Sequence, residues 1–279
     1  MSQEAIVLGG IDYSDSSRII WVLTPEYGRQ SLMVKGARRA RSKYQGVLET
    51  FNLVQAIYRK SRSGSLYVLR EADLRRHFPG IRASLEAFWA ASAAVELVRE
   101  IGREEQESRA LFELLKEFLS VADSPGQGEA GLRTLLVAFR WRLADLMGLS
   151  PRLLECIGCG TKLARQDEYG FVLTEGGLLC GACGARRPYP AGTAHSLSYQ
   201  GLRLVYRSCR RFPASVAELP ELPPAELEAV ERLCRLYLEY HLGLDPRPAG
   251  RGLGWPTGEV VQRSLRNPAQ GSRKMNNAG

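Results

Sequence analysis

The sequence has few of the residues and motifs on which many enzymes depend. Only three of its 279 residues are histidines, His77, His195 and His241, and none of them begins an H-x-E or H-E-x-x-H motif. Neither a G-x-S-x-G nor a G-x-x-x-x-G-K-[ST] motif occurs, so the chain lacks a serine nucleophile elbow and a Walker-type phosphate loop. We therefore expect a protein that is not an enzyme.

Long apolar runs are also absent. No uncharged apolar stretch approaches the ~20 residues that are needed to cross a bilayer. The first residues, Met1-Ser-Gln-Glu4, lack the positive start of a secretory signal. We expect a cytoplasmic protein with no membrane partner. With 44% hydrophobic and 24% charged residues, the composition is typical of a folded chain that is long enough for two domains and a small module.

Cysteine is scarce, but four of the six cysteines are spaced for metal binding. Cys156, Cys159, Cys180 and Cys183 form a C-x2-C-x20-C-x2-C array, and each pair is followed by glycine. Four thiolates fill a tetrahedron and leave no open position, so the array predicts one structural Zn²⁺ and argues against a catalytic one. Two disulfides are the alternative, although nothing else in the sequence indicates an oxidising compartment.

The first 79 residues predict a small five-stranded β-barrel. Strand-forming segments alternate with turns, and the expected strands are residues 4–8, 18–23, 29–35, 49–59 and 65–70. The turn between the second and third strands contains Pro25 and Gly28, and the glycine can adopt positive φ. Trp21, Phe51 and Tyr58 are expected to fill the barrel interior.

Positive charge is concentrated in the same N-terminal part. The formal net charge is +8, and the first 79 residues hold thirteen basic against seven acidic residues. Five cations lie within residues 35–43, where we expect an extended, mobile loop, and Tyr44 is the best candidate to stack on a base. A polyanion such as nucleic acid would suit this surface. The alternative is a basic loop that serves solubility alone.

From residue 80 the apolar period changes from two to about 3.6, which predicts a helical domain. The first helix should bury a face made of Leu85, Phe88, Trp89, Ala93, Leu97 and Ile101. Later helices are expected at residues 108–121, 132–147, 197–212 and 225–242, with Cys209 and Cys234 as small core residues. Arg203 and Arg207 lie off the apolar stripe of their helix, on either a solvated or a binding surface.

These patterns predict an α+β protein with several domains. The barrel occupies residues 1–79, a helical domain occupies 80–150 and 191–244, and a zinc-binding insertion occupies 151–190. Residues 245–279 are rich in Pro, Gly, Arg and Asn, and we expect a basic, disordered tail there.

Several short segments follow one another in an order that few protein families share. The most specific are Ala5-Ile-Val-Leu8, Tyr13-Ser-Asp-Ser-Ser-Arg18, Val34-Lys-Gly-Ala-Arg38, Leu48-Glu-Thr-Phe51 and Leu111-Phe-Glu-Leu-Leu115. In these segments the chain resembles bacterial RecO, the recombination mediator of the RecF pathway. The resemblance spans residues 1–244. It implies an N-terminal OB-fold and a helical domain with an inserted zinc-binding segment.

The resemblance also implies a function in DNA repair and recombination. Such a protein binds single- and double-stranded DNA, anneals complementary strands coated with single-strand DNA-binding protein, and with RecR and RecF helps to load RecA. It would be cytoplasmic and associated with the nucleoid. The expected phosphate contacts are Lys35, Arg38, Arg39, Arg41 and Lys43, together with Arg18 and Arg59. Arg203 and Arg207 are expected to bind the acidic C-terminal tail of single-strand DNA-binding protein.

A second class of function also fits the composition. A zinc-ribbon and OB-fold scaffold could bind RNA or DNA within a transcription or RNA-processing complex. The two classes differ in activity, because a mediator accelerates annealing without nucleotide whereas a scaffold only binds. A zinc-dependent hydrolase is a third class, and the four-cysteine ligand set argues against it.

Overall fold

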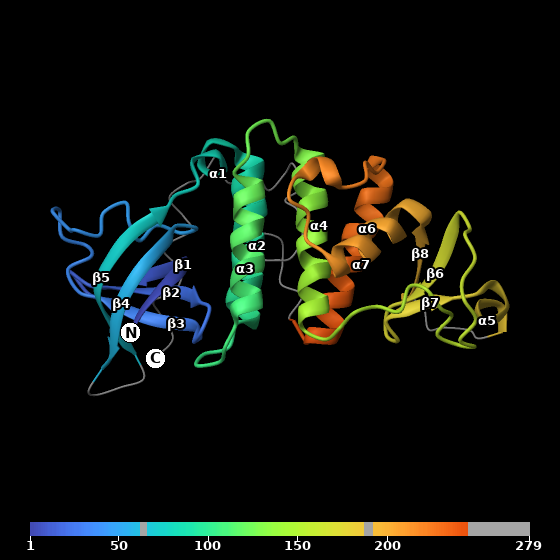
Figure 1. Ribbon diagram of the computed structural model, residues 1–279, viewed down its shortest axis with the longest axis horizontal. Coiled ribbons are helices and arrows are strands. Elements are labelled where there is room, and N and C mark those ends of the chain that lie inside the picture. Colours follow the sequence, from blue (N-terminus) through green and yellow to red (C-terminus); the bar gives the residue numbers. More distant parts are fainter. Residues whose placement is uncertain (62–65, 187–191, 245–279) are drawn as a thin grey trace, which may run out of the picture.

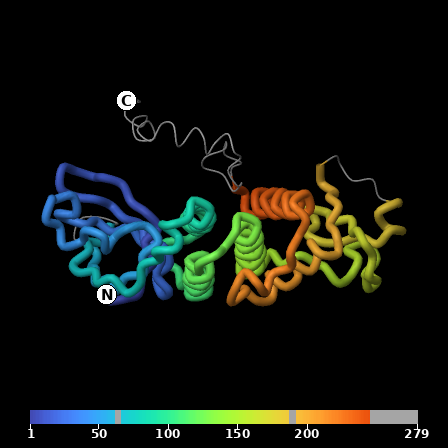
Figure 2. The backbone as a smooth tube through the Cα atoms, turned by 90° about the horizontal axis from the view of Figure 1, so that it is seen from above, coloured from blue at the N-terminus to red at the C-terminus, as the bar shows by residue number. Residues whose placement is uncertain are grey.

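The structure is a computed structural model that describes residues 1–61, 66–186 and 192–244; the tail expected over residues 245–279 lies outside this part. The chain forms an elongated molecule, with a β-barrel at one end, helices in the middle and a small sheet at the other end (Figure 1). The view from above shows the same order (Figure 2). The barrel and the small sheet therefore lie far apart.

Five strands close the N-terminal barrel in the order β1-β2-β3-β5-β4. They are β1 (Ser2–Asp12), β2 (Arg18–Thr24), β3 (Gly28–Val34), β4 (Leu53–Lys60) and β5 (Tyr67–Arg76). All neighbouring strands are antiparallel except β3 and β5, which are parallel. This arrangement confirms the predicted OB-like barrel. Tyr58 is buried in the barrel interior as predicted. Phe51 is also buried, but in the core shared with the helices, and Trp21 is only partly buried at the edge of that core.

The fourth strand begins at Leu53, four residues later than predicted. The chain turns just before it, because Phe51 has a φ of 78° and its N–H donates to the Val7 carbonyl at 2.8 Å. Residues 49–52 resemble strand residues in composition although they form this turn. Composition alone therefore did not show where pairing with β1 starts.

The turn between β2 and β3 fastens the barrel to the helices. Gly28 has a φ of 63°, as the turn chemistry predicted. A Cβ atom at this position would lie 2.4 Å from the Arg103 carbonyl oxygen, so only glycine fits. The N–H of Arg29 donates to the same carbonyl at 3.1 Å, and the N–H of Ser108 donates to the Pro25 carbonyl at 3.0 Å.

A second contact joins the barrel to the segment before the third helix. The Glu105 carboxylate accepts hydrogen bonds from Lys60 Nζ and Tyr67 Oη, both at 3.0 Å. These bonds lower the pKa of Glu105, with the Lys60 bond the larger cause. The two contacts hold the β2–β3 turn and the neighbouring ends of β4 and β5 against the loop that follows the second helix.

The helical part is built around one central helix. Its elements are α1 (Pro79–Ala83), α2 (Leu85–Ile101), α3 (Arg109–Ala122), α4 (Glu129–Leu146), α6 (Tyr199–Arg210), the short 3₁₀ helix η1 (Val216–Glu218) and α7 (Pro224–Leu242). Helix α4 is buried along most of its length and packs against α2, α3, α6 and α7. None of the helices in the described ranges is both long enough and apolar enough to cross a membrane.

The packed face of α2 differs from the predicted one. Leu85 and Phe88 are 45% and 43% exposed, although Leu97 is buried as expected. The helix instead buries four small side chains, Ala87, Ala90, Ala91 and Ala94. Small residues let neighbouring helices approach closely. The packed face therefore carries alanines in the first half of the helix and large apolar residues, Val95, Leu97 and Val98, only near its end.

A small sheet follows α4 at the far end of the molecule. It contains β6 (Glu168–Val172), β7 (Gly177–Leu179) and β8 (Ala194–Ser198) in the order β7-β6-β8, and the short helix α5 (Gly181–Arg186) follows β7. Strand β6 serves two cores. Tyr169 and Phe171 pack into the helical core, whereas Val172 packs beside the cysteines.

Candidate functional site

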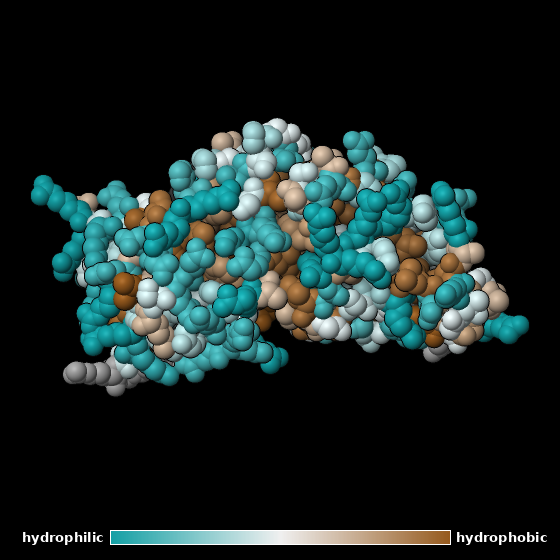
Figure 3. Space-filling model, viewed as in Figure 1, coloured by the Kyte–Doolittle hydropathy of each residue, from teal (hydrophilic) through white to brown (hydrophobic). Residues whose placement is uncertain are grey.

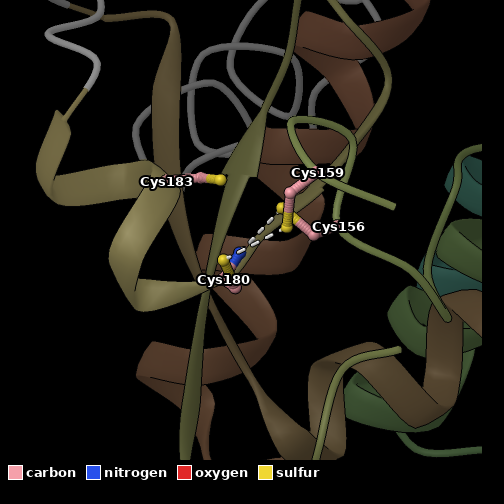
Figure 4. A group of neighbouring side chains, drawn as sticks. All are labelled: Cys156, Cys159, Cys180 and Cys183. Atoms are coloured by element: carbon pink, nitrogen blue, oxygen red, sulfur yellow. Dashed lines mark hydrogen bonds between the residues drawn. The ribbon is translucent and has the colours of Figure 1, made fainter. Parts of the chain in front are cut away.

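Four cysteines converge beside the small sheet. Cys156 and Cys159 come from the loop before β6, Cys180 follows β7, and Cys183 lies in α5. Their sulfur atoms all lie within 4.8 Å of one another and point toward a common centre (Figure 4). The sequence pairs that predicted a metal site are therefore brought together in space.

Glycines and backbone N–H groups shape this cluster. A Cβ atom at Gly158 would lie 3.1 Å from the Cys183 sulfur, so a side chain there would crowd the site. The Cys156 sulfur accepts hydrogen bonds from the N–H groups of Gly158 at 3.4 Å and Cys180 at 3.2 Å. Such bonds disperse the negative charge that four thiolates would place in a small volume.

The thiol pKa values respond to these contacts. Burial alone would raise the pKa of Cys156, but backbone N–H groups, that of Cys180 first among them, lower it to about 6. Hydrogen bonding with the Cys180 sulfur raises the pKa of Cys183 to about 12. Cys156 therefore favours the thiolate form, whereas Cys183 favours the thiol, whose proton a bound divalent cation would displace.

The donor set fits a tetrahedral metal ion. With metal–sulfur bonds of about 2.3 Å, sulfur atoms at the corners of a tetrahedron are about 3.8 Å apart. The sulfurs of Cys159 and Cys180, which come from different pairs, are separated by 3.8 Å. Four sulfur ligands within 4.8 Å of one another could hold one metal ion and would leave no position for a substrate.

The basic segment after β3 is compact, which corrects the prediction of an extended loop. Residues 35–51 form successive turns, with backbone hydrogen bonds from Arg39 to Gly36 and from Ser42 to Arg39. Tyr44 and Leu48 are buried in the barrel core and anchor the segment. Tyr44 is thus not available for base stacking, and its hydroxyl donates to the Arg70 carbonyl at 2.9 Å.

Three of the predicted phosphate contacts line one cavity of about 270 Å³ at this end of the barrel. They are Arg18, Arg38 and Arg39. Asp12, which was not among the predicted site residues, lies among them: its carboxylate is 3.2 Å from Arg38 Nε and 4.0 Å from Arg18 Nε. Asp12 lies at the end of β1, directly opposite Arg18 in the strand register. Pairing the predicted strands could therefore have indicated that the two side chains lie close together.

The other predicted phosphate contacts lie outside the lining of this cavity. Lys35 and Arg41 are exposed within the same turns, and Lys43 donates from Nζ to the Arg70 carbonyl at 3.2 Å. Arg59 is exposed on β4. The barrel end of the molecule is largely hydrophilic on the face that Figure 3 shows.

The two arginines predicted to bind an acidic tail occupy different surroundings on α6. Arg203 donates from Nη1 to the Gln200 side-chain oxygen at 3.2 Å. Arg207 is exposed and lines a groove of about 450 Å³ together with Arg211 and Phe212. Of the two arginines, Arg207 therefore lines this hollow, whose wall includes Phe212, and Arg203 lies outside its lining.

A larger groove of about 630 Å³ adjoins the end of α6. Its basic residues are Lys116, Arg142, Arg210 and Arg211, and its apolar residues include Leu114, Val121, Leu146 and Phe212. Sequence patterns did not predict this combination, because its members come from α3, α4, the end of α6 and the segment after it.

Comparison with known proteins places this geometry in a family. The model for the N-terminal part of recombination protein O matches residues 1–78, and the model for its C-terminal part matches residues 82–249. The chain belongs to the RecO family. Among curated relatives, the DNA repair protein RecO of Anaeromyxobacter sp. (strain K) is 36% identical over 242 residues, which cover 85% of this chain and 90% of the relative.

More distant members of the RecO family align over a similar length. The DNA repair protein RecO of Myxococcus xanthus (strain DK1622) is 32% identical over 241 residues, covering 86% of this chain and 91% of the relative. The protein of the same name from Rhodopirellula baltica is 30% identical over 226 residues, covering 81% of this chain and 78% of the relative. Membership of the RecO family supports a role in DNA repair.

Proposed function

We propose that this protein is a recombination mediator that binds single- and double-stranded DNA and anneals complementary strands coated with single-strand DNA-binding protein. The observation that carries the proposal is the cavity at the barrel end, where Arg18, Arg38 and Arg39 meet in a member of the RecO family. Cations that neutralise phosphates let two strands approach, and this chemistry requires no catalytic residue.

The compact loop strengthens the proposal for Lys35 and Arg39. The Arg39 side chain passes over the turn at Gly36, where a Cβ atom would lie 3.6 Å from Arg39 Cδ. Since Tyr44 and Leu48 anchor the turns that carry these cations, their positions relative to the barrel are set before DNA binds. Pre-positioned charges lose less conformational entropy on binding than charges on an extended loop.

The test is annealing of complementary single strands without nucleotide, either naked or precoated with the cognate single-strand DNA-binding protein. Wild-type protein should accelerate both reactions, and Lys35→Glu/Arg39→Glu should lose most of the acceleration. The matched control is Lys162→Glu/Arg232→Glu, which makes the same charge change at exposed residues outside the barrel. Acceleration lost equally by both double variants would mean that net charge, and not the barrel loop, carries the activity.

A protein that binds DNA but accelerates neither reaction would contradict the mediator proposal. The zinc-ribbon and OB-fold scaffold would then be the better account, because it requires binding alone. The same experiment therefore separates the two classes of function.

We propose Zn²⁺ as the ion of the four-cysteine cluster and a structural role for it. A closed set of four thiolates is the typical ligand set of structural zinc. The ion would join the loop before β6 to the segment after β7. In this proposal residues 1–79 bind DNA, residues 80–150 and 191–244 receive protein partners, and the ion stabilises the insertion at residues 151–190.

The acidic tail of single-strand DNA-binding protein would bind in the 630 Å³ groove. A peptide that ends in an aromatic residue and a carboxylate needs an apolar wall beside cations. Phe212 and Leu146 supply the wall, and Arg210 and Arg211 supply exposed charge. Arg207 lines the adjoining hollow, whereas Arg203 lines neither of the two.

A fluorescent peptide with this acidic, phenylalanine-terminated sequence tests the assignment. Arg211→Glu should weaken binding at least about tenfold, in the range of a lost charge-assisted contact. Arg203→Glu, which makes the same charge change on the same surface, should have a smaller effect. If Arg203→Glu weakened peptide binding more than Arg211→Glu, the peptide would bind at the face of α6 that the sequence predicted. RecR, RecF and RecA are the further partners that we propose on the ground of family membership.

A further inference from the structure

Two acidic residues line the cationic cavity, Asp12 and Glu49, and of these only Asp12 forms ion pairs with its arginines among the residues described. Asp12 is the last residue of β1, and Arg18, opposite it in the register, is the first residue of β2. The Asp12 carboxylate lies 3.2 Å from Arg38 Nε on one side and 4.0 Å from Arg18 Nε on the other. It therefore neutralises part of the charge that a DNA phosphate would meet there.

The contacts of Asp12 are weak ones. Its side chain is 58% exposed, and those of Arg38 and Arg18 are 41% and 36% exposed. Exposed ion pairs contribute little, because water screens both charges. A phosphate, in contrast, can accept two parallel hydrogen bonds from a guanidinium group. An incoming phosphate can therefore displace the carboxylate at low cost.

Other contacts keep the two arginines in place when the carboxylate leaves. Arg38 Nη1 donates to the Ser14 carbonyl at 2.8 Å, and the Arg38 N–H donates to the Ser16 carbonyl at 3.3 Å. Arg18 is held by the β2 ladder opposite Val34. Arg39 lines the same cavity and has no carboxylate within ion-pair distance among the residues described, so it offers a free charge to an approaching strand.

We propose that the Asp12 carboxylate occupies a phosphate-binding position between Arg18 and Arg38 and gives way to a phosphate of single-stranded DNA. This inference rests on the proposed function. Asp12 then weakens the grip of the barrel on DNA. A protein that brings strands together must also release the duplex, and a built-in competitor for two of its cations favours release.

The test compares two substitutions that make the same charge change within the same hairpin. Asp12→Asn removes the competitor. Asp15→Asn is the matched control, because Asp15 is exposed and forms no ion pair with a described residue. Affinity for a fluorescent oligothymidylate is measured by anisotropy over a series of salt concentrations. Thermal unfolding shows whether each variant is folded, and Asp12→Glu, which restores the charge, should bind like the wild type.

We expect Asp12→Asn to bind at least about threefold more tightly than Asp15→Asn at low salt, since removing one repulsion at about 5 Å in water changes affinity by about that factor. Its plot of log affinity against log salt should be steeper by about 0.7 for each additional phosphate that the variant neutralises. Arg38→Gln should also weaken binding more in the Asp12→Asn background than in the wild type.

Equal affinities for Asp12→Asn and Asp15→Asn would overturn the inference, because only long-range charge would then matter. The proposed function would stand in that case, provided that the wild type binds DNA and anneals strands. If neither the wild type nor any variant binds the oligonucleotide, the proposed function fails and the inference fails with it.

Discussion

Replacing Cys156 with alanine should release the metal and open one end of the molecule while the other end stays intact. Cys156 is 2% exposed, the most buried of the four cysteines, and its sulfur accepts N–H groups from both halves of the cluster. Among the residues described, the small core around the cysteines contains Val172 and Leu179 as its only further buried residues. So small a core would depend on the metal that we propose for it.

The magnitude follows from that core. Fully burying an aliphatic side chain contributes roughly 1.5–3 kcal/mol, so exposing Val172 and Leu179 costs about 3–6 kcal/mol of local stability. A tenfold change in an equilibrium constant corresponds to about 1.4 kcal/mol. Amide hydrogen exchange in β7 and α5 should therefore accelerate by about two to four orders of magnitude. Exchange in β2 and β3 should not change, because the barrel lies at the opposite end of the molecule (Figure 1).

The assay combines metal analysis with hydrogen exchange measured by mass spectrometry. Wild-type protein should contain one zinc per chain and the variant none. The control is Cys234→Ala, which removes a fully buried thiol from α7, away from the cluster. It should keep its zinc and lose about 1–3 kcal/mol through the cavity it creates. A Cys156→Ala variant with full metal content, or with unchanged exchange in β7, would refute the assignment of the cluster as a structural metal site.

Three further predictions concern the contacts that join the parts of the chain. Gly28→Ala should lower the free energy of unfolding by about 3 kcal/mol or more, measured in urea, because its Cβ would clash with the Arg103 carbonyl. Gly126→Ala is the control, at a φ of 75° with open space around it, and should cost only about 1 kcal/mol. Similar losses for the two variants would show that the Arg103 carbonyl can move away. The pKa of Glu105 is lowered in the folded state, so its contribution to stability should be present at neutral pH and disappear as the pH falls below 4.5. The difference in urea midpoint between wild type and Glu105→Gln should shrink over the same pH range. A constant difference would show that the Glu105 carboxylate does not form this contact. Glu231 accepts two hydrogen bonds from the Arg133 guanidinium, at 3.0 and 2.5 Å, and Glu231→Gln removes the charge of this ion pair. The substitution should cost about 1–3 kcal/mol of unfolding free energy in urea. A loss below about 0.5 kcal/mol would mean that the pair contributes no more than an exposed ion pair.

The features that the sequence predicted correctly are those with local signals. Cysteine spacing identifies the cluster because a C-x2-C pair brings two sulfurs to one ion without help from the rest of the fold. The turn at Gly28 was predictable because proline and glycine restrict the backbone in known ways. The barrel followed from strand periodicity, and the segment order indicated the RecO family before any contact was known.

The features that the sequence did not reveal depend on contacts between distant segments. The sequence around Tyr44 suggested an exposed aromatic residue in a basic loop. In the structure its hydroxyl donates to the Arg70 carbonyl on β5 and its ring is buried in the barrel core. The alanine face of α2 was not predicted because hydrophobicity scales rank large side chains above small ones. The groove at Arg211 is assembled from three separate helical segments, and no spacing within one segment indicates it.

The division of the core explains why the two ends can serve different tasks. The turns that carry Arg38 and Arg39 are anchored by Tyr44 and Leu48 in a hydrophobic cluster confined to the barrel interior. The other large cluster runs from the base of the barrel through the helices to Phe171 in β6. A disturbance at the cysteines therefore reaches the helical part through β6 before it reaches the barrel interior. Loss of the metal should weaken the proposed binding of protein partners more than the proposed grip on DNA, since the cationic cavity rests on the separate cluster.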